Sequence, residues 1–131
     1  MSLRNPMAGA RNHGSARDGV QHWWHQRLSA VLLIPLVIWL VIALQVAVDG
    51  DFSTTRQWLA LPWNTVFAIL FTASTFYHGQ LGMQVVIEDY VHTHWLEVGL
   101  LIVVKLFALV LALMGTVAIL RIAFGVAPLA G

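Results

Sequence analysis

Three long apolar runs most constrain how this chain of 131 residues folds. They extend from Leu28 to Val48, from Leu59 to Ile87 and from Val98 to Leu120. Hydrophobic residues make up 59% of the chain and charged residues only 10%, whereas an ordinary soluble domain has roughly 25% charged residues. A soluble fold of this size could not bury three segments that are apolar on every side. We therefore expect lipid to surround them.

The length of each run agrees with a membrane-spanning helix. Leu28 to Val48 is about 21 residues without a formal charge, or roughly 31 Å of helix, which is enough to cross the bilayer core. The second run is longer than a bilayer needs, so it is expected to tilt or to begin with an interfacial turn before Pro62. The sequence predicts an all-α membrane protein with three transmembrane helices, up-down-up, at about 27–48, 61–88 and 96–121.

The polar segments divide the chain further. We expect a polar cytoplasmic N-terminal arm at 1–22, a three-helix membrane anchor at 23–124 and a short tail at 125–131. Polar residues predict a short turn over 49–56 and a loop over 88–97. The arginines concentrate in the arm, so the positive-inside rule predicts a cytoplasmic N-terminus.

Composition excludes several functions. The chain has no cysteine, which rules out disulfides, iron–sulfur ligation and thiol catalysis by this chain alone. Its histidines lack the spacing of zinc sites, and there is no glycine-rich phosphate loop or basic nucleic-acid patch. Iron bound here would have to be held by histidine or methionine.

His78 is an ionisable residue deep inside the second run, roughly 15 Å from the cytoplasmic end of its helix and near the membrane midplane. One interpretation is a histidine hydrogen-bonded to a neighbouring helix. The other is an axial haem ligand, since Gly82 on the same helix face would let a porphyrin or a partner helix approach closely. A second histidine ligand would have to come from another chain.

Four further residues have two interpretations each. Asp89 lies about 16 Å beyond His78 on the same helix face, beside Tyr90, so the pair either serves a quinone and its protons or forms a solvated acid and an interfacial anchor. Lys105, at nearly the depth of His78, either meets a haem propionate or extends toward the headgroups. Arg27 either binds a propionate or a phospholipid.

The pattern H-x3-G-x6-D-Y, formed by His78, Gly82, Asp89 and Tyr90, resembles the smaller hydrophobic membrane-anchor subunit (D-type) of bacterial succinate dehydrogenase. The segment HQRLSAVLLIPL at residues 25–36 is similar to the entrance of that family's first helix. With three spans, the resemblance covers most of the chain from about residue 23 to 124.

The resemblance implies a membrane subunit of succinate:quinone oxidoreductase, respiratory complex II, in the bacterial inner membrane. Its implied partners are a C-type membrane-anchor cytochrome subunit, an iron–sulfur subunit and a flavoprotein subunit, and electrons from succinate pass to ubiquinone. It implies that His78 binds the iron of haem b, shared with the C-type subunit, and that Gly82 packs against the haem. Tyr90 and Asp89 would serve ubiquinone, while Arg27 and, from its depth, Lys105 are candidates for the propionates.

The leading hypothesis is therefore an anchor subunit without catalytic activity of its own. A redox-inactive structural membrane anchor is one alternative. A small proton-coupled transporter component that uses His78, Lys105 and Asp89 is another, although the chain lacks the internal repeats of such proteins.

Overall fold

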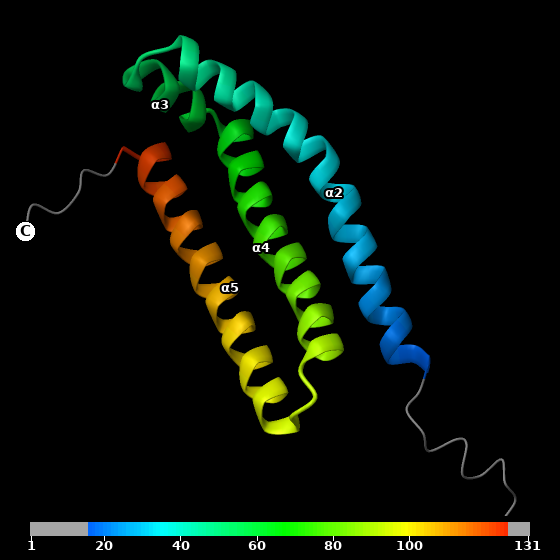
Figure 1. Ribbon diagram of the computed structural model, residues 1–131. Helices are drawn as coiled ribbons and strands as arrows, with labels where there is room; N and C mark the ends of the chain where they lie inside the picture. Colours follow the sequence, from blue (N-terminus) through cyan, green and yellow to red (C-terminus); the bar gives the residue numbers. More distant parts are fainter. Residues whose placement is uncertain (1–15, 126–131) are drawn as a thin grey trace, which may run out of the picture.

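The computed structural model describes residues 16–125, and side chains from residue 20 onward. Arg4, Arg11 and the end of the tail lie outside the described residues, so the predicted arm and tail are described only in part. Between residues 16 and 125 the chain is helical and contains no strand (Figure 1). The helices are α2 (Ala16–Asp49), α3 (Phe52–Ala60), α4 (Pro62–Tyr90) and α5 (His94–Ala123).

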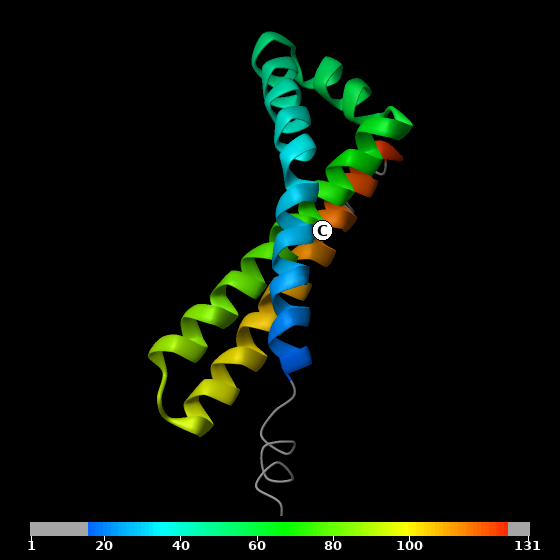
Figure 2. The same ribbon diagram turned by 90° about the vertical axis from the view of Figure 1, so that its right-hand side faces the viewer.

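The three long helices lie side by side, with α4 in the middle (Figure 1). Helix α4 contacts both α2 and α5, whereas α2 and α5 do not contact each other within the described residues. Figure 2 shows that α4 and α5 run as a close antiparallel pair and that α2 crosses this pair obliquely. Helix α4 therefore forms the contacts that hold α2 and α5 in one bundle.

The surface of this bundle is apolar on most sides. Only six of the described residues are buried: Ser29, Leu36, Ala68, Ser74, Leu81 and Ile87. Helices α2 and α5 are each long and apolar enough to cross a membrane, and the bent pair of α3 and α4 meets the same criteria as a unit. So much exposed apolar surface is stable only in lipid or against partner chains. The chain is thus a multi-pass membrane protein, with two or three spans by length and composition.

The second apolar run is broken at Leu61, where α3 and α4 meet at an angle of 88°. Pro62 occupies the first turn of α4, where its missing N–H leaves no intrahelical bond unmade. The long run is divided between two helices, because Leu59 and Ala60 end α3 and α4 begins at Pro62. A change of direction before Pro62 is confirmed, and its place at the membrane interface stays a prediction.

The prediction of a polar turn over residues 49–56 is wrong for its second half, because α3 begins at Phe52. Asp51 caps this helix: its carboxylate accepts hydrogen bonds from the Thr54 amide at 2.8 Å and from the Ser53 hydroxyl. These bonds, those with Thr54 foremost, hold the pKa of Asp51 below its usual value. The segment forms a helix despite its polar composition, because Asp51 is a good N-cap and few helix-breaking residues follow it.

Side-chain hydrogen bonds join α2, α3 and α4 at the bent end of the bundle. The Trp39 indole N–H donates to Asn64 Oδ1 at 3.2 Å, and the Asn64 amide donates to the Trp58 carbonyl oxygen at 2.8 Å. The Trp39 and Trp58 rings stack with centroids 5.9 Å apart. A polar link of this kind fixes helix positions in a region where hydrophobicity alone does not discriminate between arrangements.

Helices α4 and α5 approach each other closely at Gly115. A Cβ atom at this position would lie 2.7 Å from the Thr72 methyl carbon. Glycine is therefore required here for contact between the two backbones, as small residues generally are between membrane helices.

At the opposite end, only residues 91–93 separate α4 from α5. The predicted loop over 88–97 is shorter than expected, because both helices extend into it. Helix α2 likewise begins at Ala16, within the segment predicted to be a polar arm.

Candidate functional site

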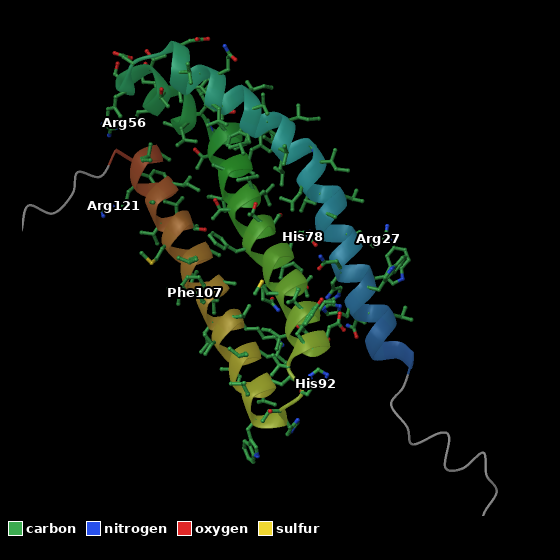
Figure 3. The ribbon with its side chains drawn as sticks, in the orientation of Figure 1. Arg27, Arg56, His78, His92, Phe107 and Arg121 are labelled. Atoms are coloured by element: carbon green, nitrogen blue, oxygen red, sulfur yellow. The ribbon has the colours of Figure 1, made fainter. Side chains whose placement is uncertain are left out.

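His78 lies on the side of α4 that faces α2 (Figure 3). Its Nδ1 atom is 3.0 Å from the Ser29 hydroxyl oxygen, and its Nε2 atom is 3.5 Å from the Gln26 amide nitrogen. The first contact has the length of an ordinary hydrogen bond, whereas the second is at the limit for one. The Nε2 atom is thus the less committed of the two ring nitrogens.

The α2 partners of His78 belong to a polar row that we call the polar seam, comprising His22, Gln26, Ser29 and His78. His22, Gln26 and Ser29 are spaced i, i+4 and i+7, so they share one face of α2. Within the described residues, His22 Nε2 and Gln26 Oε1 are buried without a hydrogen-bond partner. Buried polar atoms normally have partners, so the seam has unused capacity for a ligand or for a group on another chain.

Gly82 borders the seam. A Cβ atom at Gly82 would lie 3.8 Å from the Gln26 amide nitrogen, whereas one at Gly79 would meet nothing within 4 Å. Gly82 therefore keeps the space beside Gln26 open on the same face of α4 as His78. A Cβ atom at this distance would make an ordinary contact, and the role of Gly82 in haem packing stays a prediction.

The donor set fits a haem iron better than a metal held by several side chains. No three histidine or acidic side chains come together between residues 20 and 125. A single imidazole with one nitrogen bonded to a hydroxyl and the other weakly engaged is compatible with a ligand to haem iron.

A second polar pair lies beside the seam. The Tyr77 hydroxyl is 2.9 Å from His25 Nδ1. The pair lines a mostly apolar hollow of about 600 Å³ between α2 and α4, whose walls include Leu28, Ser29 and Ser74. Each side chain of the pair thereby gains a polar partner at the contact between α2 and α4, which lipid would not provide.

Asp89 and Tyr90 lie at the last turn of α4, away from these contacts. Tyr90 is 79% exposed, and Asp89 is exposed beside it. Helix α4 is unbroken from Pro62 to Tyr90, so the helical spacing that puts Asp89 on the face of His78 applies to it. This chain alone leaves the acid and the phenol exposed at the helix end. They would form an enclosed binding site only together with other chains.

The structure does not bring Arg27 or Lys105 to His78. Arg27 lies on the outer side of α2 (Figure 3), with its guanidinium 5.2 Å from the centre of the Trp23 ring. Lys105 borders a hollow between α4 and α5 that is also lined by Tyr77 and Gln80. Gln80 is two residues from His78, about 200° around the helix, so Lys105 and His78 meet different faces of α4.

Sequence reasoning did not identify Ser29 and Gln26 as partners of His78, nor His25 as the partner of Tyr77. A signal existed in the segment HQRLS, where polar residues recur at helical spacing at the start of an apolar run. The pairing itself depends on how α2 and α4 are rotated about their axes. No pattern in a single segment contains that information.

The fold and the seam define a multi-pass helical membrane protein with buried polar side chains between two of its helices. The family of succinate dehydrogenase/fumarate reductase transmembrane subunits matches residues 1–116. The chain belongs to this family, which confirms the resemblance read from its motifs.

Several relatives are named as membrane anchor subunits of succinate dehydrogenase. The succinate dehydrogenase hydrophobic membrane anchor subunit of Rickettsia conorii is 37% identical over 102 residues, covering 77% of this chain and 81% of that protein. The corresponding subunit of Rickettsia bellii is 36% identical over 107 residues, covering 82% and 86%. The succinate dehydrogenase membrane anchor subunit of Reclinomonas americana is 29% identical, covering 71% and 80%. No solved structure matches the chain significantly.

Proposed function

We propose that this chain is the hydrophobic membrane anchor subunit of succinate dehydrogenase and that His78 is its ligand to a shared haem b. The observation that carries the proposal is the His78 ring in the polar seam, with Nδ1 bonded to Ser29 and Nε2 in only a long contact. The haem, when bound, would supply a one-electron carrier near the membrane midplane. His78 would hold it through Nε2, and Gly82 would leave room beside it.

The second ligand would come from a C-type anchor subunit, since the printed hydrogen bonds of His78 are to Ser29 and Gln26 and not to another histidine of the described residues. Attachment of an iron–sulfur subunit and a flavoprotein subunit follows from the same assignment. The apolar exterior of α2 and α5 leaves ample surface for the partner anchor and for lipid. The subunit would have no catalytic activity alone.

Tyr90 and Asp89 would form this chain's share of the ubiquinone site. A phenol donates a hydrogen bond to a quinone carbonyl oxygen, and a neighbouring carboxylate passes protons from the aqueous side. Their exposure at the end of α4 supports a site that the other subunits complete. For Arg27 and Lys105, contact with the haem propionates stays a prediction.

The proposed topology has three spans in the bacterial inner membrane and a cytoplasmic N-terminus. Helix α4 has 29 residues, or about 43 Å, so its length suffices for a span. Helix α3 would then lie along the opposite interface from Tyr90. This arrangement puts the quinone residues on the cytoplasmic side, where soluble subunits would attach.

Haem spectroscopy of the purified complex tests the proposal. The wild-type complex should show a low-spin b-type spectrum that His78→Ala abolishes. His92→Ala is the matched control, because His92 is exposed in the loop after α4 (Figure 3) and should leave the spectrum unchanged. A wild-type complex without haem would refute the ligand role and favour a redox-inactive structural anchor.

A further inference from the structure

The Ser29 hydroxyl is buried at the contact between α2 and α4. Only 7% of the residue is exposed, and its neighbours along α2 are mostly apolar. Burying a hydroxyl among apolar groups costs free energy unless it forms hydrogen bonds. The Ser29 hydroxyl has two such contacts, one with the Gln26 carbonyl oxygen and one with His78 Nδ1. Together they determine which nitrogen of the His78 ring carries the hydrogen.

The first contact fixes the direction of the hydroxyl hydrogen. Ser29 Oγ donates to the Gln26 carbonyl oxygen at 3.0 Å. A serine hydroxyl has one hydrogen, so the same oxygen can only accept from a second partner. That partner is His78 Nδ1 at 3.0 Å. Both contacts form together only when Nδ1 carries a hydrogen and donates it to Ser29.

The contact at the other ring nitrogen agrees with this assignment. The Gln26 amide nitrogen, 3.5 Å from His78 Nε2, is a donor and requires a lone pair on Nε2. A neutral imidazole with a hydrogen on Nδ1 has its lone pair on Nε2. The Ser29 contact thus selects this tautomer, and the longer Gln26 contact is compatible with it.

We propose that Ser29 is a positioning residue for His78, whose hydroxyl holds the Nδ1–H tautomer and the ring orientation so that the Nε2 lone pair is available to haem iron. This inference rests on the proposed haem ligation. A ligand histidine is generally held by a hydrogen bond from its other nitrogen, and that bond makes the histidine a more basic ligand. A more basic ligand stabilises the ferric state, so the Ser29 bond lowers the reduction potential of the haem.

The test compares reduction potentials and electron paramagnetic resonance g values of the haem in four forms of the complex. Ser29→Ala removes the acceptor and should shift the midpoint potential upward and alter the g values, because the ring is no longer held. Ser29→Cys puts a somewhat larger and weaker acceptor at the same position and should give a smaller upward shift. Ser74→Ala is the matched control: Ser74 is also 7% exposed, lies one turn from His78 and has no hydrogen bond to its ring within the described residues. It should match the wild type.

Each outcome decides the proposal. A graded shift from wild type through Ser29→Cys to Ser29→Ala supports it, as does loss of haem from an assembled Ser29→Ala complex that Ser74→Ala retains. If Ser29→Ala prevents assembly, the Ser29→Cys potential alone decides. Unchanged potentials and g values in the Ser29 variants, or an equal shift in Ser74→Ala, overturn the role of Ser29. Absence of haem from the wild-type complex would instead refute the proposed function itself.

Discussion

Gly115→Ala should separate α4 from α5, because the added methyl group has no room. Its carbon would lie 2.7 Å from the Thr72 methyl carbon, whereas carbon atoms pack at about 3.5–4.0 Å. The Thr72 methyl cannot easily rotate away, since the Thr72 hydroxyl donates to the Ala68 carbonyl oxygen at 2.8 Å and fixes the side chain. Relieving the overlap requires a shift of about 1 Å between closely packed helices, and overpacking of this kind costs about 1–3 kcal/mol.

The same structure supplies a control and a rescue. Gly99, also on α5, has nothing within 4 Å of an added Cβ, so Gly99→Ala should leave stability unchanged or raise it slightly. Thr72→Ser removes the obstructing methyl, and the next nearest Thr72 atoms lie at 3.9 Å, an ordinary contact distance. Adding Thr72→Ser to Gly115→Ala should therefore recover most of the lost stability.

The measurement is unfolding of the full-length chain in detergent micelles by added sodium dodecyl sulfate, followed by circular dichroism. The expected order of stability is Gly99→Ala at or above wild type, then the Gly115→Ala/Thr72→Ser pair, then Gly115→Ala. Equal midpoints for Gly115→Ala and Gly99→Ala would refute the close approach at Gly115. Failure of Thr72→Ser to rescue would show that the Thr72 methyl is not the obstacle.

Three other predictions follow from particular hydrogen bonds. Tyr90→Phe should slow quinone reduction by roughly two- to tenfold, the value of one hydrogen bond of about 0.5–1.5 kcal/mol, while succinate oxidation with an artificial acceptor continues; an equal loss of both activities would indicate an assembly defect. Trp39→Phe preserves an aromatic ring beside α3 but removes the bond to Asn64, so it should lower stability in the same unfolding assay by about 1 kcal/mol, and an unchanged midpoint would contradict this. Because the pKa of Asp51 is lowered, its cap stabilises α3 fully above the ordinary carboxyl pKa, and this stabilisation is lost as the pH falls through the lowered pKa. Protection of the Thr54 amide from hydrogen exchange should fall over the same pH range. In Asp51→Asn the protection should no longer depend on pH in this range.

The apolar runs were sufficient to predict an all-helical membrane protein. Each run is a local property of the chain, and lipid requires an apolar segment to satisfy its backbone hydrogen bonds as a helix. Pro62 marked the helix start for the same local reason. The polar turn before α3 was predicted wrongly, because composition was weighed above the capping geometry of Asp51.

Site residues on one helix were predictable in part. His78 and Gly82 stood out from their apolar surroundings, and helical spacing put them on one face with Asp89. Their partners on α2 were not identified, since contact between helices depends on their rotation and crossing angle. Arg27 and Lys105 were predicted to contact the haem propionates, and the structure puts both on faces of the bundle away from His78.

The sequence by itself therefore determined the apolar helices and the presence of one histidine that lipid cannot satisfy. The tertiary structure alone decided that this histidine faces α2 and that Ser29 and Gln26 meet its two nitrogens. The reason is that helices apolar on all sides carry little information about which face meets a neighbour. Close contacts such as Gly115 with Thr72, and polar links such as Trp39 with Asn64, set that rotation instead.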